Sequence, residues 1–245
     1  MNLSGKTALV TGAGTGIGKG IAVALAKRGA NVAIHYNSSD TGARETQQQI
    51  DACSGQSMIV QANIAYKPEI EHMVNVVGNR FGGIDILVNN AALQLNVDFF
   101  AYMDDQFDQL MHINLKGYLQ CIQAVVPHMK ANGFGRIINI SSVHGKRPTD
   151  FDVIYCMTKG GIHMLGRESA IELAKYGITV NTIEPGAVDV GKQGKLKRGV
   201  NRKKFPMGRV GLPSDIASMA CYIASEESEF MTGASIRLDG GSMLL

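Results

Sequence analysis

The sequence predicts an α/β fold in which a doubly wound parallel β-sheet carries helices on both faces. Short runs rich in valine and isoleucine alternate along the whole chain with longer segments whose apolar residues recur at helical spacing. Several short runs are apolar almost throughout, which is typical of strands buried on both faces. Regular strand–helix alternation implies parallel strands joined by right-handed crossovers, so helices are expected to cover both sides of the sheet.

Seven segments have the features of strands, because they are brief, rich in β-branched residues and bounded by glycine, asparagine or aspartate. They cover residues 6–10, 31–36, 57–64, 84–89, 135–141, 178–184 and 235–238. Six longer segments have helix periodicity and cover residues 17–28, 41–53, 68–81, 104–132, 152–176 and 213–225. No internal repeat, low-complexity tract or linker divides the chain, so a single domain over residues 1–245 is expected.

The composition is that of an ordinary globular protein, with 45% hydrophobic and 18% charged residues. The four cysteines are widely scattered, and no Cys/His cluster has the spacing of metal ligands, so neither a metal site nor a disulfide framework is expected. The N-terminal residues enter a predicted strand at once, and no stretch approaches 18 uninterrupted apolar residues. We therefore expect a soluble cytoplasmic protein that does not cross a membrane.

A glycine-rich turn, Thr-Gly-Ala-Gly-Thr-Gly-Ile-Gly, follows the first expected strand and opens the first expected helix. Glycines let the backbone turn sharply and approach a pyrophosphate, and the helix N-terminus offers unpaired N–H groups to it. A glycine pattern alone is weak evidence, but here the required strand before it and helix after it are present. The turn predicts a dinucleotide site with contacts from Gly12, Thr15, Gly16, Ile17 and Gly18.

The end of the second expected strand bears on the choice between NAD and NADP. An acidic residue there would accept the ribose hydroxyls of NAD and repel a 2′-phosphate, but no acid occurs before Asp40. Tyr36, Asn37 and Ser38 can donate hydrogen bonds to a phosphate, and His35 could add charge. NADP is therefore favoured, and NAD is possible because a neutral turn can also tolerate both cofactors.

Tyr155 and Lys159 are four residues apart in an expected helix, which places a phenol and an ammonium on one helical face. A free phenol has a pKa near 10 and is a poor base at neutral pH, but a fixed cation nearby stabilises the phenolate. Such a pair often occurs by chance as two exposed side chains. Its neighbours in the sequence indicate proton transfer instead.

Three further groups accompany this pair. Ser142 ends an expected strand thirteen residues before Tyr155, at the sheet edge where parallel sheets place their sites. Asn114 lies inside the long helix expected over residues 104–132, where a poor helix former would be explained by a kink and a water held for a proton relay. Asn90 and Ala91 follow the fourth expected strand, where a turn of small residues can abut the cofactor.

With these motifs, the chain resembles the short-chain dehydrogenase/reductase family over its whole length. The resemblance extends to Pro185-Gly186 after the sixth expected strand and to Asp239-Gly240-Gly241 near the end. It implies a Rossmann-type sheet of seven parallel strands, a homotetramer or dimer, and hydride transfer between NAD(P) and a CH–OH or carbonyl group. It also implies further cofactor contacts from Asn90, Ala91, Tyr155, Lys159, Pro185, Gly186 and Val188.

The resemblance also implies a role for each catalytic group. Tyr155 would be the general acid and base, and Lys159 would lower its pKa and bind the nicotinamide ribose. Ser142 would orient and polarise the substrate carbonyl, Asn114 would anchor the proton relay, and Asn90 would support the cofactor region.

Three positions depart from the family pattern. Asn63 stands where an aspartate usually accepts the adenine amine, and its side-chain oxygen can still accept that bond. Ala92 replaces a glycine, which is a small change. Val190 stands where a threonine commonly bonds the carboxamide, so one nicotinamide contact is in doubt.

The substrate is less well defined than the reaction. Local likeness to bacterial glucose 1-dehydrogenases predicts a sugar-like or other polar alcohol, and 3-oxoacyl-[acyl-carrier-protein] reductase is the alternative. Ser142, Tyr155 and His144 are expected at the substrate, although His144 could equally lie in a surface turn. A regulator that senses nucleotides without catalysis is the remaining alternative, and the intact Ser142, Tyr155, Lys159 and Asn114 argue against it.

One segment carries a strong positive charge. Eight of the 24 basic residues but only one of the 21 acidic residues lie between Asp189 and Arg209, so the rest of the chain has a net charge of −4. In the family this region, about residues 187–209, is the substrate lid. The charge predicts either a solvated loop or attraction of an anionic small-molecule substrate or acidic carrier. Nucleic acid is not expected, because the segment contains one aromatic residue, Phe205.

Overall fold

The computed structural model describes residues 1–148, 152–191 and 205–244. Its single sheet has seven parallel strands in the order β3-β2-β1-β4-β5-β6-β7. The strands are β1 (Thr7–Val10), β2 (Asn31–Tyr36), β3 (Ser57–Gln61), β4 (Ile86–Asn89), β5 (Gly135–Ile140), β6 (Ile178–Pro185) and β7 (Ser235–Leu238). This confirms the predicted seven-stranded, doubly wound sheet, with strand ends that differ by no more than three residues from the expected ranges.

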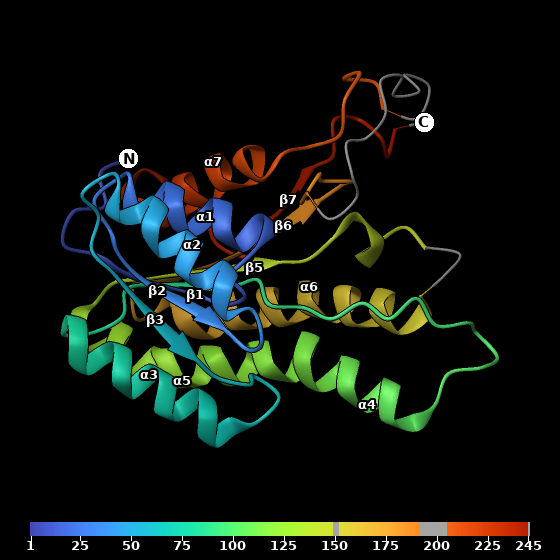
Figure 1. The fold of residues 1–245 in the computed structure, drawn as a ribbon, viewed down its shortest axis with the longest axis horizontal. Coiled ribbons are helices and arrows are strands. Elements are labelled where there is room, and N and C mark those ends of the chain that lie inside the picture. Colours follow the sequence, from blue (N-terminus) through green and yellow to red (C-terminus); the bar gives the residue numbers. More distant parts are fainter. Residues whose placement is uncertain (149–151, 192–204, 245) are drawn as a thin grey trace.

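Helices cover both faces of the sheet, as Figure 1 shows. One layer contains α1 (Gly16–Ala26), α2 (Asp40–Asp51) and α7 (Pro213–Ala224). The other layer contains α3 (Lys67–Phe81), α4 (Asp104–Met111), α5 (Gly117–Asn132) and α6 (Val153–Ala174). Short turns η2 (Val143–Gly145) and η3 (Glu226–Ser228) follow β5 and α7.

The strands are apolar on both faces because each face packs against its own hydrophobic core. Ala8 and Val10 of β1 point into the core beneath α1 and α7, whereas Leu9 between them belongs to the core beneath α3 and α5. The same alternation places Ile86 and Val88 in the first core and Leu87 in the second. The continuous apolar runs of the sequence thus arise from burial on two sides rather than one.

The long helix expected over residues 104–132 is interrupted at Asn114. A π-helical turn, η1 (His112–Lys116), separates α4 from α5, and the Gly117 N–H bonds to the His112 carbonyl five residues earlier. π-Turns inside α-helices are rare and often mark functional positions. The kink predicted from the asparagine is therefore present, and it takes the form of one widened turn.

The topology fixes where a site can form. Successive connections from β1 run toward β2 and β3, whereas β4 starts the other half of the sheet on the opposite side of β1. The chain thus diverges in opposite directions at the carboxyl ends of β1 and β4, and open parallel sheets bind ligands in the crevice at such a switch point. The glycine-rich turn, Asn90 and Ser142 all follow strands at this edge.

Gly18 of α1 lies where the helix approaches the glycine-rich turn. A Cβ at this position would lie 2.5 Å from Asn90 Nδ2 and would also overlap the Gly12 carbonyl. Because packed interiors have no room for an added methyl group, only glycine allows α1 to start this close to the turn.

We predict that Gly18→Ala lowers the free energy of unfolding by about 1–3 kcal/mol and weakens cofactor binding, because the turn must shift. Chemical denaturation and a cofactor titration measure both effects. Gly160→Ala is the matched control: it is also helical, its added Cβ would lie at an ordinary 3.4 Å from the Gly145 carbonyl, and it should gain up to about 1 kcal/mol. Equal losses in both variants would contradict this account of Gly18.

Candidate active site and cofactor pocket

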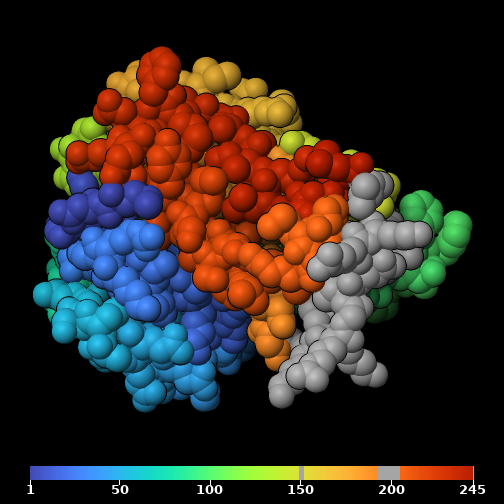
Figure 2. Space-filling model, turned by 90° about the horizontal axis from the view of Figure 1, so that it is seen from above, coloured from blue at the N-terminus to red at the C-terminus, as the bar shows by residue number. Residues whose placement is uncertain are grey.

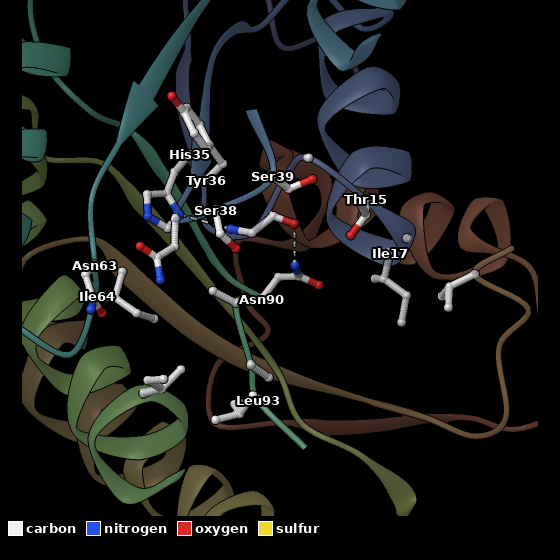
Figure 3. Close-up of a pocket in the computed structure, with 18 residues that line it drawn as sticks. Thr15, Ile17, His35, Tyr36, Ser38, Ser39, Asn63, Ile64, Asn90 and Leu93 are labelled. Carbon is white, nitrogen blue, oxygen red and sulfur yellow. Dashed lines mark hydrogen bonds between the residues drawn. The ribbon is translucent and has the colours of Figure 1, made fainter. Parts of the chain in front are cut away.

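A pocket of about 560 Å³ opens at the carboxyl ends of β1, β2 and β4 (Figure 3). Ten residues predicted to bind the cofactor line it: Gly12, Thr15, Gly16, Ile17, Tyr36, Asn37, Ser38, Asn63, Asn90 and Ala91. Eight further residues complete the lining: Gly14, His35, Ser39, Ile64, Ala92, Leu93, Ile113 and Val190. The structure thus brings together side chains from the glycine-rich turn and from three strand ends.

Two polar side chains fix the glycine-rich turn against the end of β4. Asn90 Nδ2 donates to the carbonyls of Thr11 and Gly12 at 2.9 and 3.2 Å, and Figure 3 shows its amide aimed toward the turn. Thr11 Oγ1 accepts the N–H groups of Asn90 and Ala91 at 2.9 and 3.1 Å. The support role expected of Asn90 therefore has a clear physical basis, and Thr11 is its partner.

His35 is buried, and both ring nitrogens lie at hydrogen-bond distance from backbone groups. Its side chain is 1% exposed, its Nδ1 accepts the Gly12 N–H at 3.0 Å, and its Nε2 lies 2.9 Å from the Ala62 carbonyl. Burial lowers the pKa of His35 to about 4. The expectation that His35 adds positive charge is thus wrong: the ring is neutral and holds the turn in place.

Tyr36 lines the pocket, but its hydroxyl already has a partner in the Asp40 carboxylate. Burial and this hydrogen bond raise the pKa of Tyr36. Arg44 Nε in turn donates to Asp40 Oδ2 at 2.8 Å, and this bond holds the pKa of Asp40 below its usual range. The first acid after β2 is therefore paired with a cation one helical turn away, whereas the nearby polar side chains of Asn37, Ser38 and Ser39 have no such partner among the described residues.

Asn63 lines the pocket where an adenine acceptor was expected. Its Oδ1 accepts the Ala65 N–H at 3.0 Å, and an amide oxygen has a second lone pair for another donor. The expected contact to an amine is compatible with this arrangement.

Six of the predicted cofactor residues do not line the described pocket: Gly18, Tyr155, Lys159, Pro185, Gly186 and Val188. Gly186 instead allows close packing, since a Cβ there would lie 2.8 Å from Asp239 Cβ. Val188 forms a bridge to Gly211 and packs on the core beneath α1. Val190, two residues further along, is the member of this segment that reaches the pocket.

The buried Ser142 and Lys159 and the partly buried Tyr155 form a cluster where β5 and α6 meet. Ser142 is 7% exposed and its hydroxyl bonds to the Tyr155 phenol. Lys159 is 2% exposed, its Nζ donates to the Ile140 carbonyl at 2.8 Å, and it lies 5.5 Å from the centroid of the Tyr155 ring. The structure therefore gathers the three groups that the sequence predicted to act together.

The pKa values of this cluster reflect burial above all. Desolvation raises the pKa of Tyr155 to about 12 against the lowering effect of the Ser142 hydrogen bond, and it lowers the pKa of Lys159 to about 7. The expectation that Lys159 brings the phenol below its ordinary pKa is not met by these residues alone. They hold Tyr155 as a protonated phenol, ready to donate.

Asn114 connects the cluster to the pocket. Its Oδ1 accepts the Leu93 N–H at 2.7 Å, and its Nδ2 donates to the Leu93 carbonyl at 2.8 Å and to Thr158 Oγ1 at 3.3 Å. Thr158 Oγ1 in turn donates to the Tyr155 carbonyl at 2.7 Å. The Asn114 side chain thus joins the pocket wall to the catalytic helix, and a role in proton relay stays a prediction.

His144 is bonded within its own turn, since its Nδ1 lies 3.2 Å from the Arg147 carbonyl. Contact with a substrate stays a prediction.

Most of the basic segment, residues 192–204, lies outside the described residues. Of its described members, Arg209 pairs with Asp215 at the start of α7 through two bonds of 2.6 and 2.9 Å, so one of the eight charges serves to anchor the segment.

Sequence reasoning missed several residues that build the site. Asp152 caps α6 at the position three residues before Tyr155, and an aspartate just before a helical pattern is a recognisable N-cap signal. Thr11 and His35 carried no such signal, because their partners lie on other strands.

The exposed side chains Phe99, Phe100 and Tyr102 precede α4, in the connection that projects from one end of the molecule in Figures 1 and 2.

Among the described residues, no helix is both long and apolar enough to cross a membrane. The same residues contain no group of three or more histidine, cysteine or acidic side chains placed to hold a metal ion.

A parallel switch-point sheet, a glycine cradle and a Ser–Tyr–Lys cluster together define an oxidoreductase that binds a nicotinamide dinucleotide. Comparison with known proteins agrees. A family profile described as enoyl-(acyl carrier protein) reductase matches residues 12–243. The chain belongs to the short-chain dehydrogenase/reductase family and acts on CH–OH or carbonyl groups.

The chain is similar to curated and solved members along nearly their whole lengths. It is 36% identical to 3-oxoacyl-[acyl-carrier-protein] reductase of Staphylococcus epidermidis, covering 96% of this chain and 98% of the relative. It is 34% identical to glucose 1-dehydrogenase 2 of Bacillus subtilis, covering 99% of this chain and 96% of the relative. A crystal structure of a short-chain dehydrogenase/reductase from Mycobacterium marinum superposes with a TM-score of 0.92 at 31% identity. The match covers 100% of this chain and 97% of the solved chain.

We predict that His35 makes the protein less stable in acid. Its native pKa of about 4 lies below its ordinary 6.5, so the unfolded chain binds more protons between these values and the free energy of unfolding falls as the pH drops through them. The loss from this group is about 3 kcal/mol and is complete near pH 4. Urea denaturation at several pH values measures it.

His35→Gln should abolish that component of the pH dependence, because the amide does not titrate. His72→Gln, on the exposed face of α3, is the control and should keep the wild-type slope. If the His35 and His72 variants have the same slope, the buried neutral histidine is not the cause.

Proposed function

We propose that this protein is an NADP-preferring dehydrogenase/reductase that interconverts a polar, sugar-like or anionic secondary alcohol and its carbonyl compound. The observation that carries the proposal is the Ser142–Tyr155–Lys159 cluster, joined to the dinucleotide pocket through Asn114 and Leu93. The proposal assigns the proton chemistry to Tyr155 and the positioning of the carbonyl to Ser142.

The pocket fits a dinucleotide on grounds of space and polarity. Gly12 has a φ of +64°, and a Cβ there would lie 2.9 Å from the Ala91 Cα, so glycine is required for the turn to pack this closely against the end of β4. Gly16, Ile17 and Asn90 would hold the phosphates and the nicotinamide half, and Asn63 the adenine. When bound, the nicotinamide supplies the hydride acceptor or donor.

Tyr155 acts as the proton donor during carbonyl reduction. A phenol with a raised pKa keeps its proton at neutral pH, and the Ser142 hydroxyl beside it can hydrogen-bond the same carbonyl oxygen. In alcohol oxidation the phenol must first lose that proton. A cation beside it favours that loss, and the buried Lys159 is placed to provide one below its pKa of about 7.

Lys159 is fixed rather than mobile. Its ammonium donates to the Ile140 carbonyl, and its own backbone carbonyl accepts the Ser141 hydroxyl at 2.8 Å. The remaining Nζ hydrogens are free to donate to a ribose hydroxyl. The two roles predicted for this lysine are thus compatible with one fixed position.

NADP is preferred because, in the part of the chain that the structure describes, no unpaired carboxylate faces the end of β2. Asp40 is neutralised by Arg44, and Asn37 and Ser38 can donate to a 2′-phosphate. Arg44 is itself exposed and within one turn of the N-terminus of α2, where a phosphate is also stabilised by the helix dipole.

Reduction of a 3-oxoacyl group on an acidic carrier is the second candidate. Phe99, Phe100 and Tyr102 are exposed in the segment that leaves the pocket wall at Leu93, and Phe100 is 92% exposed. An apolar acyl chain would gain from contact with this segment, and the basic residues between Asp189 and Arg209 would attract an acidic carrier. A screen of aldoses, hydroxy acids and oxoacyl thioesters with both cofactors separates the two candidates.

A regulator without catalysis is disfavoured by the intact cluster. In such a protein we would expect cofactor binding without turnover across the whole substrate panel, and that outcome would contradict the proposed function.

Assembly as a homotetramer and a cytoplasmic location also belong to this proposal. An apolar groove of about 650 Å³ between α5 and α6 supports association with a second copy. Its apolar lining consists of Leu119, Ile122, Val126, Pro127, Leu165 and Leu173.

We predict that Tyr155→Phe lowers turnover at least about 100-fold, the scale of a lost general acid, and leaves cofactor affinity nearly intact. Steady-state kinetics and a fluorescence titration with reduced cofactor measure the two quantities. Near-normal turnover would rule out Tyr155 as the proton donor.

We also predict that neutralising Lys203 and Lys204 raises KM for an anionic substrate, and more strongly at low than at high salt, because salt screens long-range attraction between charges. Kinetics at about 20 and 500 mM salt measure the difference. Arg209→Gln, whose wild-type charge is paired with Asp215, is the control. An effect independent of salt would show that these charges do not steer the substrate.

A further inference from the structure

Asp152 is a buried carboxylate at the start of the helix that carries Tyr155. Its side chain is 2% exposed, and its Oδ1 accepts the Tyr155 N–H at 2.9 Å. Its backbone carbonyl accepts the Cys156 N–H at 3.2 Å. Asp152 is thus the N-cap of α6, and it fixes the first turn of the helix at the residue where the proton is transferred.

The second carboxylate oxygen holds a different segment. Asp152 Oδ2 lies 3.3 and 3.4 Å from the backbone N–H groups of Leu95 and Asn96, which donate to it. Asn96 has a φ of +53°, a conformation that costs energy for a residue with a side chain. The two bonds to Asp152 help to hold the chain in this turn.

The same segment is tied to the active site at its other end. Leu93 lines the dinucleotide pocket, and both its backbone polar groups bond to the Asn114 side chain. Residues 93–96, which we call the pocket wall, are therefore fixed by two buried polar side chains from η1 and from the start of α6. Both of these side chains are linked to Tyr155 within one or two hydrogen bonds.

Asp152 also places a negative charge beside the phenol. The titratable and polar groups that face Tyr155 are Ser142 before η2, Tyr118 from α5, Cys156 and Lys159 from its own helix, and Asp152 at the N-cap of that helix. Burial raises the pKa of Tyr155 most, the Ser142 hydrogen bond lowers it, and Cys156 and Asp152 raise it further. In this cluster, Asp152 is the carboxylate among the described residues.

We propose that Asp152 is a positioning residue that fixes Tyr155 and the pocket wall 93–96 as one unit, and that its carboxylate adds to the effect of burial in keeping the proton on the phenol. The inference rests on the proposed role of Tyr155 as acid and base. Asp152 itself would contact neither substrate nor cofactor. It would determine the position of Tyr155 and favour the protonated phenol.

Two substitutions test this role. Asp152→Asn keeps the length of the side chain and an oxygen for the Tyr155 N–H, but it removes the charge, and its NH₂ group cannot accept the N–H groups of Leu95 and Asn96. Asp152→Ser can still cap the helix through its hydroxyl, but it is too short to reach Leu95 and Asn96 as well. Asp85→Asn is the matched control, since Asp85 is also buried and accepts a backbone N–H, from Thr7, at the opposite edge of the sheet.

The readout is the pH dependence of kcat/KM for alcohol oxidation together with KM for the alcohol. In both Asp152 variants, the rise of kcat/KM with pH should move to lower pH by about 0.5 unit or more, because the opposing charge is gone. Both variants should in addition raise KM at least about 3-fold, as expected for loss of a hydrogen bond of roughly 0.7 kcal/mol at the pocket wall. Asp85→Asn should lower the melting temperature and leave the pH profile unchanged.

An unchanged pH profile in Asp152→Asn would show that the residue is a helix cap only, and would overturn the proposal. If Asp152→Ser does not fold, Asp152→Asn carries the test of both the charge and the pocket-wall bonds. Failure of the underlying function is recognised separately: a wild-type pH profile that persists in Tyr155→Phe would show that Tyr155 does not titrate in the reaction at all.

Discussion

The burial of Lys159 is the constraint on which the rest of the site depends. A lysine ammonium loses much of its hydration inside a protein, and this one has its pKa lowered to about 7 by that loss. It is retained because the Ile140 carbonyl accepts a bond from it and because α6 places it 5.5 Å from the Tyr155 ring. Since the unfolded lysine binds its proton up to about pH 10.5, burying it costs stability at neutral pH, which proteins accept at functional positions.

Polar side chains at the carboxyl edge of the sheet support this arrangement from several directions. Asn90 and Thr11 join the glycine-rich turn to β4, and His35 holds the same turn from β2. Asn114 and Asp152 join the pocket wall to the catalytic helix. Each bond runs between segments far apart in the sequence, so the cofactor pocket and the proton-transfer cluster are parts of one rigid assembly.

The sequence predicted the fold and the identity of the catalytic groups because these follow local rules. Strand and helix periodicity, the glycine spacing and the separation of Tyr155 from Lys159 are all visible in one dimension. The neutral state of His35 and the raised pKa of Tyr155 were not predictable, because both are set by burial against distant residues. The π-turn at Asn114 lay between these cases: the sequence indicated a disruption, and only packing against Leu93 and Thr158 defined its form.

A buried lysine with an unusually low pKa stands beside the phenol that donates the proton. NMR of protein labelled with ¹³C at the lysine Cε positions, titrated from pH 5 to 11 and assigned with Lys159→Met, measures that pKa directly. One lysine resonance, missing in the variant, should titrate near pH 7, while the exposed lysines titrate near 10.5. If every lysine titrates near pH 10.5, Lys159 is solvated, and this account of the active site is wrong.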